Sequence, residues 1–156
     1  MSNVSYAVWA FAAGALIPLM AILNAGLARS AGGPVLASVI LFTIALAASL
    51  LVLAVSTVRI PELAALIRIP PALYAGGVIV AFYVLSITFL APRFGVGNAI
   101  LFAVTAQLIS AAAIDHFALA GAVMRPLTSM RMVGLTVVVI GVILTQIADR
   151  VAGPSR

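Results

Sequence analysis

The residues best suited to chemistry lie in the stretch TAQLISAAAIDHF, which spans positions 105–117. It ends on an acid beside a histidine, Asp115 and His116, and these residue types serve in general acid–base catalysis. The sequence has a single histidine and no cysteine, so no further imidazole or thiolate stands at metal-ligand spacing. The GxSxG and GxxxxGK[ST] motifs are also missing from the sequence, which argues against an activated serine and against ATP hydrolysis. We therefore predict no enzyme, no metal site and no cofactor.

Asp115 and His116 stand at the end of an apolar stretch, and this position suggests other roles. They are polar residues where a buried segment reaches water, partners in the hydrogen bonds of a helix turn, or a gate. The sequence leaves these three interpretations open.

The composition indicates a membrane protein. Of the 156 residues, 65% are hydrophobic and 7% are charged, and a soluble domain of this length carries far more charge. The net charge of +5 arises because the sequence has eight arginines and only three acidic residues. The arginines are scattered between long apolar runs and form no basic patch, so we expect membrane lipid and no nucleic acid as a partner.

Five segments reach, or nearly reach, the roughly 20 apolar residues that a helix needs to cross the hydrocarbon core. Lipid offers no hydrogen-bond partner to the backbone, so helix is the expected conformation, and the period-two alternation of a β-barrel is missing. We expect an all-α, polytopic membrane protein with one transmembrane domain, residues 1–156, and a short interfacial helix at 60–69. The predicted spans are 4–28, 35–58, 72–92, 96–114 and 131–149.

The arginines do not indicate which way the chain inserts. Loop arginines and lysines usually gather on the cytoplasmic side. Here each side of the predicted spans holds four: Arg29, Arg93, Arg150 and Arg156 on one, and Arg59, Arg68, Arg125 and Arg131 on the other. This balance suggests insertion in both orientations, although eight charges also balance by chance. Two oppositely oriented copies would form a ten-helix inverted repeat, an architecture on which many secondary transporters are built.

Polar residues near the middle of the predicted spans are candidates for lining a solute pathway. Gln107 lies about 3 Å from the centre of its helix, and Tyr83 is about as central. A buried amide in lipid needs a partner, so Gln107 should face protein or a water-filled cavity that Tyr83 shares. Hydrogen bonding between helices is the open alternative. Pro18 should kink the first helix, and Asn24, nearer its end, either lines a vestibule or caps the helix.

Small residues on the last predicted helix form a candidate dimer face. Gly134 and Gly141 share one side of this helix, and small residues at such spacing allow close backbone approach. Packing within the chain is the alternative interpretation.

Four stretches together carry a family resemblance: GALIPLMAILNAGLA, AFYVLSITFLAPRFG, AQLISAAAIDHF and RPLTSMRMVGLTVVVIGVIL. They resemble the five-helix, half-size branch of the drug/metabolite transporter (DMT) superfamily, which is related to EamA-like transporters of largely unknown function. The resemblance covers nearly the whole chain and implies a half-transporter that pairs antiparallel with itself or with an oppositely oriented paralogue. Members often carry glutamine just after the proline–leucine pair of the first helix, where this chain has Met20. If this position touches solute, the chain should prefer a more apolar one.

The resemblance and the balanced arginines predict a secondary transporter or facilitator of small organic metabolites or drugs in the bacterial inner membrane. It would work as an antiparallel homodimer by alternating access. The candidate residues that line the substrate are Gln107, Tyr83, Met20, Asn24 and Pro18. The alternative is a structural or accessory membrane subunit with no pathway of its own.

Overall fold

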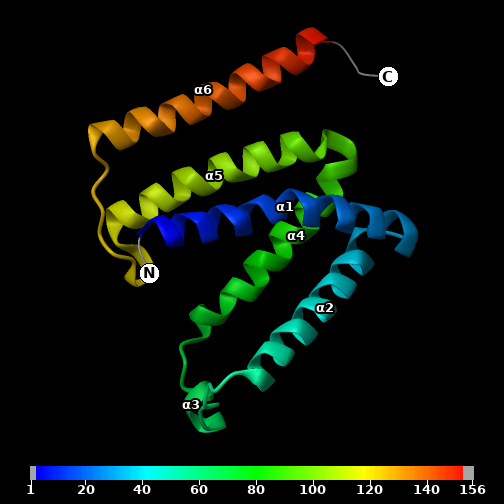
Figure 1. The fold of residues 1–156 in the computed structure, drawn as a ribbon, viewed down its shortest axis with the longest axis vertical. Helices are drawn as coiled ribbons and strands as arrows, with labels where there is room; N and C mark the ends of the chain where they lie inside the picture. Colours follow the sequence, from blue (N-terminus) through cyan, green and yellow to red (C-terminus); the bar gives the residue numbers. More distant parts are fainter. Residues whose placement is uncertain (1–2, 153–156) are drawn as a thin grey trace. The chain divides into compact units, whose positions relative to one another are not determined.

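The computed structural model describes residues 3–152, and within this range all regular secondary structure is helical (Figure 1). In the described range five helices are long and apolar enough to cross a membrane, which confirms the prediction of an all-α protein with five spans. The chain divides into two compact units, Met1–Val96 and Gly97–Arg156. The spans are formed by α1 (Asn3–Ala31), α2 (Pro34–Val55), η1 with α4 (Pro71–Tyr74 and Ala75–Phe94), α5 (Val96–Phe117) and α6 (Ser129–Ala152).

In the first unit, α1, α2 and α4 pack against one another (Figure 1). Their contacts are built largely from alanine: Ala21 and Ala25 of α1, Ala37 of α2 and Ala91 of α4 are each at most 4% exposed. Small side chains let membrane helices approach closely and gain van der Waals contact, because lipid supplies no hydrophobic force between helices. Most of the larger apolar side chains, such as Leu23, stay exposed on the helix surfaces.

The turn between α1 and α2 depends on two glycines. Gly32 has φ 88° and Gly33 has φ 145°, in the region that favours glycine. The Gly33 N–H donates to the carbonyl of Ala28 over 2.8 Å, which closes α1 in the manner of a Schellman motif. Pro34 then occupies the first turn of α2, where a missing N–H costs nothing. The AGGP sequence thereby makes a tight hairpin.

The second helix ends at Val55, before the predicted residue 58. Ser56 stops it, because its backbone N–H and its hydroxyl both donate to the carbonyl of Leu53, over 3.2 and 2.8 Å. Serine competes with the helix in this way at helix ends. The segment that follows contains the short helix α3 (Leu63–Ile67), and the Tyr74 hydroxyl holds it by donating to the carbonyl of Leu66 over 2.9 Å.

The second unit consists of α5 and α6, which run antiparallel beside each other (Figure 1). Side chains join them: Gln146 Nε2 donates to Asn98 Oδ1 over 2.8 Å. The connection between them contains the 3₁₀ turn η2 (Leu119–Gly121). Since α5 extends to Phe117 rather than the predicted residue 114, the acid–histidine pair lies in its last turn.

Candidate functional site

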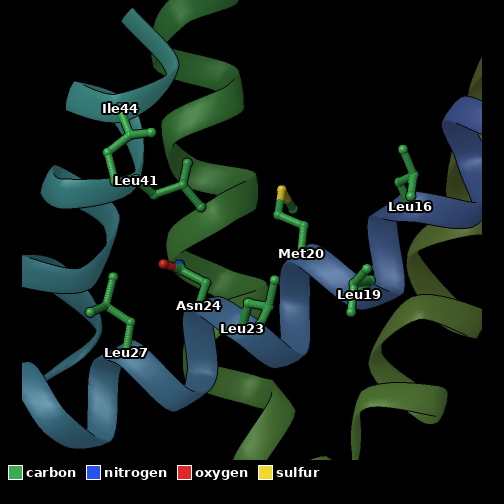
Figure 2. A pocket seen from close by; sticks show the side chains of 8 residues that line it. All are labelled: Leu16, Leu19, Met20, Leu23, Asn24, Leu27, Leu41 and Ile44. Atoms are coloured by element: carbon green, nitrogen blue, oxygen red, sulfur yellow. The ribbon is translucent and has the colours of Figure 1, made fainter. Parts of the chain in front are cut away.

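A pocket of about 360 Å³ opens between α1 and α2 of the first unit (Figure 2). Its size falls within the range of small-molecule sites, which are mostly apolar with few polar groups. Two of the predicted substrate-lining residues, Met20 and Asn24, come together on successive turns of α1 in its wall. The remaining lining residues are all apolar, namely Leu16, Leu19, Leu23, Leu27, Leu41 and Ile44.

Asn24 is the polar residue of this pocket and is only 3% exposed. Its Nδ2 donates to Thr88 Oγ1 over 2.6 Å, and the Thr88 hydroxyl donates to the carbonyl of Val84 over 2.7 Å. Asn24 Oδ1 has no hydrogen-bond partner among the described residues. Asn24 therefore does not cap α1, which continues to Ala31; it couples α1 to α4 inside the apolar core.

Sequence reasoning missed Thr88, because only the structure shows that it lies on the packed face of α4. Thr88 stands four residues after Val84 and three before Ala91, and all three are buried. This spacing belongs to one face of a helix. A threonine on the packed face of a membrane helix is a candidate partner for a polar residue on a neighbouring helix.

The other predicted lining residues stand apart from this pocket's wall. Pro18 lies within α1, and the helix continues through it. Tyr83 is half-buried in α4 of the first unit, whereas Gln107 lies in α5 of the second unit. That Tyr83 and Gln107 share a cavity stays a prediction.

Gln107 is exposed, although it lies in the middle part of α5. The buried residues of that helix are Ala99 and Ala112. Gln107 is rotated from them by about 80° and about 140°, respectively, so it shares its side of the helix with neither. An amide exposed at this depth would meet lipid, which offers it no hydrogen bond. The Gln107 amide therefore needs a hydrogen-bond partner from outside the α5–α6 pair.

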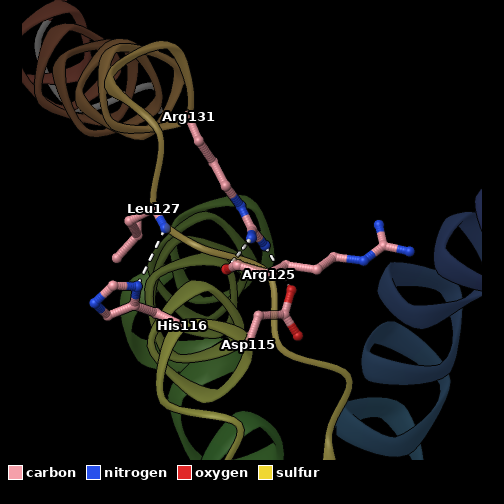
Figure 3. Close-up of polar contacts among 5 residues, drawn as sticks. All are labelled: Asp115, His116, Arg125, Leu127 and Arg131. Carbon is pink, nitrogen blue, oxygen red and sulfur yellow. Dashed lines mark hydrogen bonds and ion pairs between the residues drawn. The ribbon is translucent and has the colours of Figure 1, made fainter.

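Asp115 and His116 hold the connection between α5 and α6 (Figure 3). Arg131 Nη2 donates to Asp115 Oδ2 over 2.7 Å, and the Arg125 N–H donates to the main-chain carbonyl of Asp115 over 2.9 Å. The Leu127 N–H donates to His116 Nδ1 over 3.2 Å. The structure thus places the pair in hydrogen bonds at a helix end, one of the three interpretations, and Arg131 is a partner that the sequence did not reveal.

The two glycines of α6 form an open surface. Gly134 and Gly141 are exposed, and a Cβ added to either would meet no other atom within 4 Å. The face that they share is thus unpacked within the described part of this chain, and its use as a dimer face stays a prediction.

The sequence matches one family model over residues 5–144, that of DMT_YdcZ, described as "Putative inner membrane exporter, YdcZ". No curated protein and no solved structure gives a significant match. The family match covers most of the chain, including all or most of each of the five helices that can cross a membrane. The chain therefore belongs to the DMT_YdcZ family and is a multi-pass protein of the inner membrane.

Proposed function

We propose that the chain pairs with an inverted copy of itself and exports small organic molecules by alternating access. The observation that carries this proposal is the low burial of the individual spans. In the most apolar window of each span, no more than 17% of the residues are buried. Many secondary transporters hold their solute at the interface of two inverted halves, near the bilayer midplane, and a second copy would provide the missing half.

The exposed Gln107 supports the same pairing. Its amide needs a cover that lipid does not give, and the partner copy or the solute itself would supply hydrogen bonds. Tyr83 would contribute to the same pathway from α4. Pro18 would let α1 bend between the outward-open and inward-open states, because a proline removes one helical hydrogen bond and loosens the helix there.

The charge distribution supports inversion. Four arginines lie on each side of the five spans, so the bias that fixes most membrane proteins in one orientation is missing. An oppositely oriented paralogue would serve equally well as the partner if the cell makes one.

A flux assay tests the function directly. The purified protein is reconstituted into vesicles, and the release of a panel of labelled small organic compounds is compared with release from protein-free vesicles. We expect faster release of at least one compound, and a several-fold loss of this flux in Gln107→Leu and Tyr83→Phe. Thr43→Val is the matched control, since Thr43 is exposed on α2 and its hydroxyl only donates to the carbonyl of Val39. Flux equal to that of empty vesicles for the whole panel would contradict the proposal.

A further inference from the structure

One polar atom in the wall of the pocket between α1 and α2 lacks a partner. The Thr88 hydroxyl has a single proton, which it donates to Val84, so its oxygen can only accept from Asn24. This fixes the amide with Nδ2 toward Thr88 and leaves Oδ1 as an unused acceptor. The orientation of the amide thus follows from the hydrogen bonds around it.

An unused, buried carbonyl is unusual in a folded protein, because burial removes its water without replacing the hydrogen bond. Asn24 Oδ1 is such a group, with the side chain 3% exposed. Figure 2 shows the amide directed toward α2, between Leu27 and Leu41. A donor that enters the pocket from a bound molecule would satisfy it.

We propose that Asn24 Oδ1 accepts a hydrogen bond from the transported solute, and that the pocket takes neutral, mainly apolar molecules that carry one hydroxyl or N–H group. The proposal rests on the transport function for its physiological meaning. It names the class of solute from the pocket chemistry: one hydrogen-bond acceptor among apolar walls.

The charges of the pocket support a neutral solute. None of its lining residues is charged, so an anion would meet only an acceptor oxygen and a cation would lack a counter-charge. Either ion would lose its hydration in an apolar site without compensation. A hydroxyl or N–H group needs only the one acceptor that Asn24 offers.

The walls beside the amide can move to admit the solute. Leu27 and Leu41, which flank it, are half-buried, and leucine side chains change between staggered rotamers without backbone movement. Such a change would expose Oδ1 to a molecule already lying in the pocket. Met20, an unbranched and adaptable side chain, can follow the shape of different apolar solutes.

Two probes of nearly the same size separate the contribution of the donor from apolar contact. 1-Naphthol carries a hydroxyl donor, whereas 1-methoxynaphthalene carries only an acceptor. Binding of each is measured by equilibrium dialysis against the protein in lipid nanodiscs, with empty nanodiscs subtracted. We expect 1-naphthol to bind the protein about tenfold more tightly, the ratio that one net hydrogen bond gives.

Variants of Asn24 and Thr88 test which atom accepts the hydrogen bond from the probe. In Asn24→Leu the preference for 1-naphthol should fall to about onefold, while 1-methoxynaphthalene still binds, which also shows that the pocket is intact. In Thr88→Val the Asn24 N–H that bonded to Thr88 is freed, so 1-methoxynaphthalene, which carries an acceptor, should gain affinity, and the ratio of the two affinities should narrow. Leu23→Phe, which fills the pocket, should weaken both probes equally.

The outcomes separate this inference from the function. Equal binding of the two probes, as an apolar groove filled by lipid would give, overturns the inference even if the vesicle assay detects flux. An unchanged 1-naphthol preference in Asn24→Leu also overturns it. Donor-dependent binding in a protein that shows no flux upholds the site and contradicts the transport function.

Discussion

The hydrogen bond between Asn24 and Thr88 should dominate the polar energetics of the first unit, and Thr88→Val tests it. This change removes the acceptor of Asn24 Nδ2 and leaves both polar atoms of a buried amide without a partner. Leaving one buried polar group unsatisfied costs about 1–3 kcal/mol. We therefore expect Thr88→Val to lower the free energy of unfolding by about that amount.

Asn24→Leu should lower the free energy of unfolding less than Thr88→Val does, although it removes the same hydrogen bond. Leucine has nearly the shape of asparagine, the unpartnered Oδ1 disappears, and the Thr88 hydroxyl keeps its bond to Val84. When both partners become apolar the effect can be nearly neutral. The double variant Asn24→Leu/Thr88→Val should thus be more stable than Thr88→Val alone.

The assay is a double-mutant cycle on four proteins in lipid bicelles, with unfolding by added detergent followed by circular dichroism. Hydrogen bonds between membrane helices average about 0.6 kcal/mol and reach about 1.7 kcal/mol in such cycles. A buried bond of 2.6 Å should lie in the upper half of that range. Additive effects of the two substitutions, with no rescue in the double variant, would refute the reasoning.

Three further predictions concern other parts of the chain. Gly134→Leu or Gly141→Leu should leave the helical content unchanged, since a side chain there meets no other atom within 4 Å. If this face joins the two copies, either change should dissociate the dimer, as measured by size-exclusion chromatography. Gly14→Leu, equally unhindered within the chain, is the control and should leave the dimer intact. Ala118→Gly should stabilise the protein by up to about 1 kcal/mol, because Ala118 has φ 49° and the left-handed region strains a Cβ. A melting temperature that does not rise would contradict this. Arg131→Gln removes the ion pair to Asp115, whose side chains are about one-third exposed, and such a pair stabilises the fold by about 1 kcal/mol or less. We expect faster hydrogen exchange confined to the connection between α5 and α6. Unchanged exchange would contradict the role of this ion pair in holding the connection.

The number and type of helices could be predicted from the sequence, because each span is a long apolar run and lipid permits little except helix. The AGGP stretch at 31–34 accounts for the turn between α1 and α2, since glycines and a proline have a defined use in such a turn. Helix ends were less certain: Ser56 ends α2 by a local hydrogen bond that competes with the helix.

The polar contacts could not be predicted from the sequence. Asn24 and Thr88 are 64 positions apart and Asn98 and Gln146 are 48 apart, so each pairing depends on how neighbouring helices are rotated and aligned. Apolar periodicity carries little of this information in a membrane helix, which is apolar on nearly every side. Arg131 was therefore counted only as a loop charge, although it also pairs with Asp115.

The orientation of the chain in its native membrane tests the central proposal most directly. The sequence has no cysteine, so single cysteines can be placed at Ser30, in the last turn of α1, and at Thr57, just after α2. These two positions lie on opposite predicted faces of the membrane. Each is labelled in spheroplasts with a membrane-impermeant maleimide and, as the control, after permeabilisation. Inverted pairing predicts that about half of each cysteine is labelled from outside. Full labelling of one site with none of the other would show a single orientation and contradict the inverted homodimer.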